Sequence, residues 1–222
     1  MAGFLDTFKK ADVFGKKGNS ALGVDIGSSS IKVVQLKKED GVAVLETYGE
    51  LSLGPYEGVA IGKATSLPAE KIAEATKDLI RESNVTTTNA GLSIPFASSL
   101  LTFIELPGLD TRQLNKMIPI EARKYIPVPI SEVMLDWFIV PQPDNASAEQ
   151  KKKAQVLLVA IHNDVLNNYN TIVEKSGLKT DFFEIEIFST IRSVLDQNIP
   201  SARYSWFHKL IANLYATVHQ RT

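Results

Sequence analysis

The stretch GVDIGSSSIKVVQL, residues 23–36, decides the fold. Two runs of apolar and β-branched residues flank a turn of glycine and serines, which is the pattern of two antiparallel strands. An Asp-Gly pair at residues 40–41 separates them from a third run, VAVLETYGEL (42–51), and Asp-Gly between apolar runs indicates a hairpin. The sequence therefore predicts that three antiparallel strands open the fold.

A helix and a further strand are predicted next along the chain. Pro68 suits the first turn of a helix over residues 68–82, whose apolar residues fall on one face: Ile72, Ala75, Leu79 and Ile80. AGLSIP (90–95) then has the composition of a buried strand. The order strand-strand-strand-helix-strand is the opening of a ribonuclease-H-like α/β unit.

Residues 97–179 are expected to form a separate α+β unit. Asp110 and Gln113 have the spacing of a capping box, so a helix should begin there and run toward Tyr125, with Pro119 inside it. Apolar runs predict the three strands of this unit, over residues 99–106, 133–140 and 155–161.

A second helix of this unit is predicted to begin at Asn163 or Asp164, as its capping residue, and to end at Gly177. A short strand and a helix over residues 180–202 then return to the first unit. The last part of the chain, residues 203–222, is set apart as a tail because its composition changes.

Composition and charge exclude several classes of protein. The 222 residues are 44% hydrophobic and 22% charged, which is ordinary for a globular protein and argues against a disordered chain. The net charge of −1 disfavours a nucleic-acid binder held by phosphate contacts. The absence of cysteine removes disulfides, thiol nucleophiles and cysteine-ligated zinc. With no apolar run near 20 residues and no signal-peptide core, a cytoplasmic protein is the expectation.

Residues 1–20 predict a short amphipathic helix followed by a linker. Apolar residues fall near helical spacing, with four lysines between or after them: Lys9, Lys10, Lys16 and Lys17. One interpretation is weak contact of residues 1–17 with an anionic membrane surface or a partner. The other is a plain helix at the end of the chain, and both stay open.

The turn inside the opening stretch is the strongest candidate for a binding site. Glycine lets backbone amides approach oxygen atoms closely, and serine hydroxyls add hydrogen-bond donors. A lysine on the returning strand can neutralise phosphate, and an aspartate can hold Mg²⁺ directly or through water. The candidate phosphate and magnesium residues are Asp25, Gly27, Ser28, Ser29, Ser30 and Lys32. A plain β-turn is the alternative.

Three other motifs are weaker. GVAIGKA (58–64) has three residues between its glycines and no Ser or Thr after the lysine, so it is rejected as a nucleotide loop and expected to be an exposed loop. Glu184 and Glu186 could do acid–base or metal work, but solvent-facing acids at a strand end are favoured. His162 is expected to be a structural or surface histidine.

The opening stretch resembles the first phosphate motif of the actin-like ATPase superfamily, and Asp25 and Lys32 stand seven residues apart, as in actin. Three further stretches resemble one branch, the PilM family of type IV pilus assembly proteins: ELPGLD (105–110), IEARKYIPVPISEVMLDWFIV (120–140) and GLKTDFFEIEIF (177–188). EARKYIPVP is not found in actin, chaperone or sugar-kinase relatives. The first 20 residues are also similar to the basic N-terminus of this family, and the resemblance covers roughly residues 1–201.

The resemblance implies an actin-like fold of two lobes. Residues 21–96 with 180–202 would be the ribonuclease-H-like first subdomain, and 97–179 the inserted α+β subdomain that this family shares with the cell-division protein FtsA. It also implies ATP and Mg²⁺ as ligands, with the turn residues from Asp25 to Lys32 as their contacts. The implied location is cytoplasmic, peripheral to the inner membrane.

The resemblance further implies a partner. Family members dock the N-terminal cytoplasmic peptide of the inner-membrane protein PilN and so belong to the inner-membrane platform of the pilus. Residues 91–106 and 120–140 are then the candidates for the peptide groove. A non-enzymatic assembly role is expected. An FtsA-like membrane-associated cytoskeletal protein and an ATPase or sugar-kinase-like phosphotransferase are the alternatives.

The tail departs from the family pattern. Relatives enter a second lobe that opens with an Asp-x-Gly phosphate motif, due here just after Ala202, whereas this chain reads RYSWFHKLIANLYATVHQRT (203–222). The last glycine of the chain is Gly177 and its last acidic residue is Asp196. A truncated or frameshifted reading frame, with the second lobe missing, is the hypothesis. A neighbouring frame of the gene should restore the Asp-x-Gly strand, and its absence from both frames contradicts the hypothesis.

Negligible affinity for Mg-ATP is expected of this chain. In the implied fold a nucleotide is held between two lobes, and each lost charge-assisted hydrogen bond removes about 1.5–3 kcal/mol. Losing about four such bonds weakens binding by several powers of ten, because each power of ten in affinity corresponds to about 1.4 kcal/mol. Calorimetry with Mg-ATP measures this directly, and a micromolar dissociation constant contradicts it.

Overall fold

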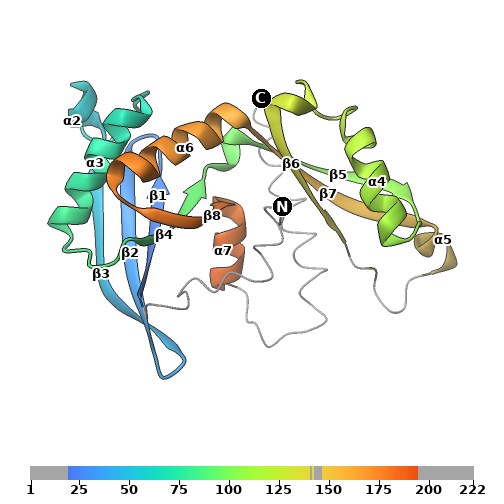
Figure 1. Ribbon diagram of the computed structural model, residues 1–222, viewed down its shortest axis with the longest axis horizontal. Coiled ribbons are helices and arrows are strands. Elements are labelled where there is room, and N and C mark those ends of the chain that lie inside the picture. Colours follow the sequence, from blue (N-terminus) through green and yellow to red (C-terminus); the bar gives the residue numbers. More distant parts are fainter. Residues whose placement is uncertain (1–19, 141, 143–146, 195–222) are drawn as a thin grey trace.

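The chain builds two β-sheets of different size, which Figure 1 shows side by side. The computed structural model describes residues 20–140, 142 and 147–194. The larger sheet, in the order β3-β2-β1-β4-β8, contains β1 (Ser20–Ile26), β2 (Ser30–Glu39), β3 (Val42–Ser52), β4 (Asn89–Ile94) and β8 (Lys179–Ile185). The smaller sheet, in the order β5-β7-β6, contains β5 (Ser99–Pro107), β6 (Val133–Ile139) and β7 (Lys153–His162).

The larger sheet has the predicted opening. β1, β2 and β3 pair antiparallel, so the predicted hairpins are confirmed, and β1, β4 and β8 pair parallel. β1 is central, and its last residues pair with both neighbours: Asp25 stands opposite Lys32 on β2 and opposite Ser93 on β4. This mixed order confirms the ribonuclease-H-like α/β class.

Two helices cover one face of the larger sheet. α3 (Ala69–Glu82) and α6 (Asn163–Ser176) pack against each other on that face (Figure 1). The buried residues of α3 include Leu79, which lies in one hydrophobic core with Leu22 and Val33 of the sheet. α7 (Glu186–Val194) follows β8 directly and buries Phe188 in the same core. Within the described ranges, no helix is long and apolar enough to cross a bilayer.

α6 connects the smaller sheet to the larger one. It follows β7 and leads into β8, and its inner residues Leu166, Tyr169 and Ile172 belong to the core of the larger sheet. The assignment of residues 97–179 to a separate subdomain stays a prediction, but α6, which lies within this range, packs against the larger sheet. The predicted cap was wrong: His162 is the N-cap with no side-chain bond, and Asn163 Nδ2 donates instead to the Ser131 carbonyl at 2.9 Å.

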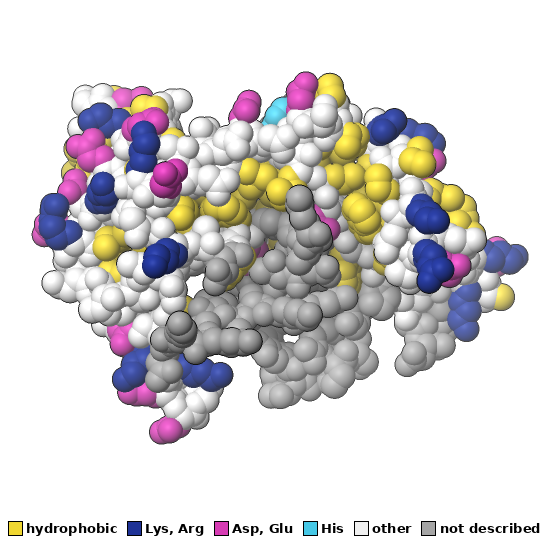
Figure 2. All heavy atoms as spheres, in the orientation of Figure 1, with side chains coloured by type: hydrophobic (Ala, Val, Ile, Leu, Met, Phe, Trp, Pro, Cys, Tyr) yellow, Lys and Arg dark blue, Asp and Glu magenta, His cyan; other side chains and the backbone are white. Residues whose placement is uncertain are grey.

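The smaller sheet buries its two faces differently. α4 (Thr111–Ala122) covers one face, where Ile118 packs with Val156 and Leu158 of β7. On the opposite face, Leu157 and Ile161 of β7 belong to the core of the larger sheet. The two bodies therefore share one continuous core, and Figure 2 shows hydrophobic side chains in a band from one to the other.

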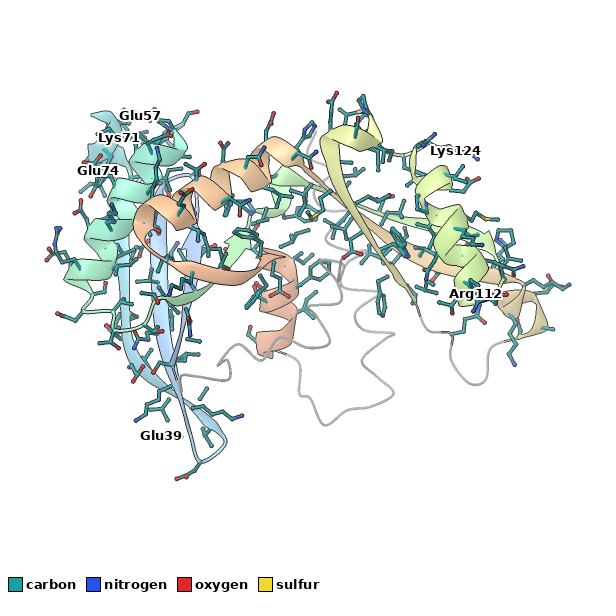
Figure 3. The ribbon with its side chains drawn as sticks, in the orientation of Figure 1. Glu39, Glu57, Lys71, Glu74, Arg112 and Lys124 are labelled. Carbon is teal, nitrogen blue, oxygen red and sulfur yellow. The ribbon has the colours of Figure 1, made fainter. Side chains whose placement is uncertain are left out.

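Short helices occupy the connections: α2 (Gly54–Glu57), η1 (Phe96–Ser98), η2 (Ile130–Glu132) and α5 (Ala148–Lys151). Glu39 lies at the tip of the β2–β3 hairpin, while Glu57 lies at the opposite end of the same sheet, near Lys71 and Glu74 of α3 (Figure 3). The N-terminal segment 1–20 is described only at Ser20. The tail 203–222 and the end of the predicted 180–202 segment lie outside the described residues.

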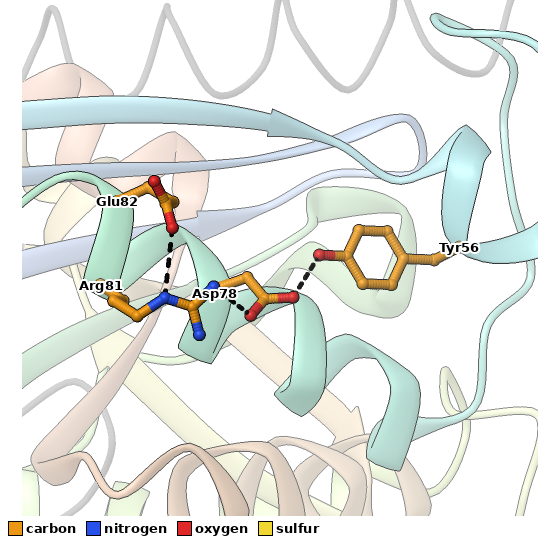
Figure 4. Close-up of polar contacts among 4 residues, drawn as sticks. All are labelled: Tyr56, Asp78, Arg81 and Glu82. Atoms are coloured by element: carbon orange, nitrogen blue, oxygen red, sulfur yellow. Dashed lines mark hydrogen bonds and ion pairs between the residues drawn. The ribbon is translucent and has the colours of Figure 1, made fainter.

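A polar link holds α2 against α3 (Figure 4). Tyr56 Oη donates to Asp78 Oδ2 at 2.7 Å, and Arg81 Nη2 lies 2.9 Å from Asp78 Oδ1. Arg81 Nε also donates to Glu82 at 3.2 Å. The Tyr56 hydroxyl, followed by Arg81, lowers the pKa of Asp78 below its ordinary value, and burial chiefly raises the pKa of Tyr56 to about 12. This link fixes the loop after α2, which leads back to the turn between β1 and β2.

The capping box of α4 is confirmed, and it supports a stability prediction. Asp110 accepts from the Gln113 amide at 2.9 Å, and the Asp110 amide donates to Gln113 Oε1 at 3.4 Å. Asp110→Ala removes the acceptor and should lower the free energy of unfolding by about 1 kcal/mol in a urea titration. Asp110→Asn keeps an acceptor and is the matched control. Equal stability of the alanine variant and the parent contradicts the role of the cap.

The Tyr56–Asp78 bond predicts a pH-dependent effect of Tyr56→Phe. A carboxyl whose pKa is lower in the folded state than in the unfolded state, where it is 3.8, stabilises the fold at pH values above that unfolded-state pKa. This stabilisation is lost as the pH falls through the pKa of the folded state. The variant should therefore be less stable than the parent at neutral pH, and the difference should shrink in acid. Urea titrations at both pH values measure it.

Tyr48→Phe is the control for this experiment, since Tyr48 is 72% exposed. An identical pH dependence for the parent and Tyr56→Phe shows that the bond does not hold the Asp78 carboxylate.

Candidate functional site

The carboxyl ends of the parallel strands bring polar side chains together. Asp25 and Ser93 are the next-to-last residues of β1 and β4, and Glu186 opens α7 directly after β8. Tyr169 of α6 is buried in the core of the larger sheet, and burial, followed by the charges of Asp25 and Glu186, raises the pKa of its phenol. Ligands of open α/β sheets bind at the carboxyl ends of the strands. This edge of the larger sheet is therefore the candidate site.

The turn between β1 and β2 forms one wall of the site. The Gly27 amide donates to the Ser30 carbonyl at 3.0 Å, and a Cβ on Gly27 would stand 3.3 Å from the same oxygen. In the part of the chain that the structure describes, the amides of Ser28 and Ser29 donate to no protein acceptor. Two adjacent amides of this kind form an anion-binding concavity.

The segments before and after α2 hold this turn from behind. The Ser28 carbonyl accepts from the Thr65 amide at 2.8 Å and from Thr65 Oγ1 at 2.9 Å, while the Ser29 carbonyl accepts from the Leu53 amide at 2.8 Å. Because a peptide group is planar and trans, holding the Ser28 carbonyl on one side of the turn makes the Ser29 amide point to the other side. Sequence reasoning missed Thr65, because it is 37 residues from Ser28 and no motif marks it.

Lys32 lies next to the turn, but it is not isolated. Its Nζ donates to Ser30 Oγ at 3.2 Å and lies 3.6 Å from Glu50 Oε1 of β3, with about half of the side chain exposed. Glu50 is the residue paired with Lys32 in the register of β2 and β3. Lys32 can therefore bind an anion at the turn only if it gives up its ion pair with Glu50.

Asp25 is held by a residue that the sequence did not single out. Ser93 Oγ donates to Asp25 Oδ1 at 2.5 Å, across the parallel pairing of β1 and β4. No group of three acidic or histidine side chains suited to a metal occurs among the described residues. Mg²⁺ usually keeps several waters and uses one or two carboxylates together with phosphate oxygens. Asp25 and the turn fit such a hydrated ion with a phosphate.

The predicted solvent-facing acids at residues 184 and 186 were wrong. Glu184 is only 9% exposed, and Glu186 accepts a hydrogen bond from the Phe96 amide at 2.8 Å. Both are covered because β8 runs into α7 without a loop and the start of the smaller sheet passes alongside. The other weak motifs fit their predictions, since residues 58–64 and His162 are exposed.

The ranges expected to form the peptide groove contribute the two edges of the smaller sheet. Residues 91–106 contain the end of β4, η1 and most of β5, and residues 120–140 contain the end of α4, η2 and β6. β5 and β6 flank β7, so they are the edges of the smaller sheet. On the face opposite α4, Met134 pairs with Ile161 and is 47% exposed. Sequence reasoning assigned no individual residue here.

A family model described as Type IV pilus assembly protein PilM matches residues 23–212. This match continues past residue 202, into the segment that the sequence composition set apart as a tail. Among solved structures, the chain is similar to a chain of a PilM–PilN type IV pilus biogenesis complex, with 22% identity and a TM-score of 0.62 over 78% of this chain and 49% of that one.

A second similar structure is the cytoplasmic domain of EpsL, an inner-membrane component of the type II secretion system of Vibrio cholerae. The identity is 13% and the TM-score 0.51, over 81% of this chain and 60% of that one. The chain thus spans about half the length of the chain from the pilus complex and 60% of the cytoplasmic domain of EpsL.

These likenesses agree with the mixed α/β fold predicted from the sequence. The family match covers both sheets, the candidate phosphate turn and the helix that joins the two bodies. The chain belongs to the PilM family of type IV pilus assembly proteins.

Proposed function

We propose that this chain works on the cytoplasmic side of the type IV pilus inner-membrane platform and binds the N-terminal cytoplasmic peptide of PilN. The family match over residues 23–212 carries the proposal. The similar solved structure comes from a PilM–PilN complex, which supports PilN as the partner. The match also favours this role over an FtsA-like cytoskeletal protein or a phosphotransferase.

The peptide would dock at the edge of the smaller sheet formed by β6. None of the seven residues of β6 is buried, and the strand has a neighbour on one side only among the described strands. An extended peptide can add as a further strand to the outward N–H and C=O groups of an edge strand, and here a peptide carbonyl would replace the Asp136 carboxylate that accepts from the Trp137 amide at 2.8 Å. Met134 then supplies apolar contact for a side chain of the peptide, because it lies on the face opposite α4.

We also propose that the turn is the phosphate-binding part of an ATP site. The amides of Ser28 and Ser29 would contact phosphate oxygens, Lys32 would neutralise charge, and Asp25 would hold Mg²⁺ through water. The arrangement of the turn supports this, since its carbonyls are fixed on the side of Thr65 and Leu53. No residue is assigned a catalytic role.

A pair of variants tests the peptide site. Met134→Glu places a charge on the face opposite α4 and should weaken binding of a PilN N-terminal peptide by about tenfold or more, because a charge would be buried against apolar contacts. Ile120→Glu is the matched control: Ile120 is 63% exposed in the same 120–140 range, but on the outer side of α4. Fluorescence anisotropy with a labelled peptide measures both.

The proposal fails if the parent chain, shown to be folded by its unfolding transition, does not bind the peptide. Equal affinity of Met134→Glu and the parent keeps the partner but contradicts the β6 edge as the place of binding.

A further inference from the structure

The outer surface of α4 carries a row of positive side chains. Arg112, Lys116 and Arg123 are all exposed, and Arg123 continues the helical backbone as the C-cap. At about 100° per residue, these three positions fall within about 40° of one another around the helix. Ile120, which is 63% exposed, lies beside them. We call Arg112, Lys116 and Arg123 the α4 basic row.

The cations of the row lack the ion pairs that balance charge elsewhere. Within residues 20–140, 142 and 147–194, neither Arg112, Lys116 nor Arg123 makes an ion pair. On α3, by contrast, Lys71 pairs with Glu74 at 2.8 Å and Arg81 with Asp78 at 2.9 Å. α3 (Ala69–Glu82) carries four acidic residues against three basic ones, whereas the three cations of the α4 row have no paired acid among the described residues.

The positive surface continues onto α5. The Gly108 amide, just before α4, donates to the Lys152 carbonyl at 2.6 Å, which brings α5 against the start of α4. Lys152 and Lys153 are paired with Glu149 and Glu105, but Lys151 is exposed and makes no ion pair inside the described ranges. Figure 2 shows Lys and Arg side chains, in blue, along this end of the molecule, and Figure 3 shows Arg112 and Lys124 at opposite ends of α4.

We propose that the α4 basic row, together with Lys151, binds the anionic phospholipid headgroups of a membrane. Four cations on one surface give measurable attraction to an anionic leaflet. The row spans about 16 Å along a convex helix, at about 1.5 Å per residue, which suits a flat charged layer better than a peptide that needs a groove. Exposed Ile120, beside the row, fits the boundary of headgroups and acyl chains.

This surface is distinct from the proposed peptide site. α4 covers one face of the smaller sheet, and the row points away from that sheet, while Met134 lies on the sheet's opposite face. A chain held by α4 at a membrane would therefore keep the β6 edge open to PilN. The lipid contact does not depend on PilN binding, so an experiment can contradict either proposal without contradicting the other.

Sedimentation with vesicles tests the proposal. The full chain is mixed with vesicles of equal parts phosphatidylglycerol and phosphatidylcholine, and with vesicles of phosphatidylcholine alone. The triple variant Arg112→Gln, Lys116→Gln, Arg123→Gln should lose about a hundredfold in partitioning to the anionic vesicles, since each cation contributes about a factor of five. The parent should bind them more weakly as salt is raised, and the neutral vesicles hardly at all.

The control variant Lys38→Gln, Lys77→Gln, Lys179→Gln removes the same charge from exposed positions on the larger body, none of which makes an ion pair among the described residues. It should partition like the parent. All three proteins keep residues 1–17, so the contribution of that segment is common to them.

Equal losses in the two triple variants overturn the proposal, because net charge alone would then explain the binding. A parent chain that fails to sediment with anionic vesicles also overturns the proposal. Release of the parent chain from these vesicles by an acidic peptide does so as well. Unfolding transitions and PilN-peptide binding, measured on each variant, separate a lost surface from a lost fold.

Discussion

The register of β1 against its two neighbours sets the position of every group at the candidate site. Antiparallel pairing with β2 puts Lys32 opposite Asp25, and parallel pairing with β4 puts Ser93 on the other side of the same residue. Because side chains alternate between faces, a slip of one residue would turn Asp25 toward α3 and α6 and expose Val24. The apolar residues of β1, packed under these helices, therefore hold the polar ones in place.

α6 gives the molecule its second organising constraint. It leaves the smaller sheet at His162 and buries Tyr169 in the core of the larger one, close to Asp25 and Glu186. The phenol is thus part of the core that joins the two bodies and part of the wall of the site. A change at the carboxyl edge of the larger sheet has a direct physical route to the smaller sheet, through this helix and the shared core.

Local patterns were enough to predict the elements, and contacts distant in sequence were not. The hairpins, the capping box of Asp110 and Gln113, and the end of α6 at Gly177 follow from neighbouring residues, and all are present. Ser93 was missed because its bond to Asp25 joins residues 68 apart, and only the parallel register creates it. Glu184 and Glu186 were expected in solvent because an isolated strand end is exposed, whereas here α7 and Phe96 cover it.

An amide map of the peptide complex tests the account most directly. In a two-dimensional NMR titration of the isotope-labelled chain with the PilN N-terminal peptide, the account predicts shifts concentrated in residues 91–106 and 120–140, largest along β6. The outer positions of α4 and the exposed side of α3 should shift little. Shifts centred on α3, or no shifts in a folded chain, would contradict it.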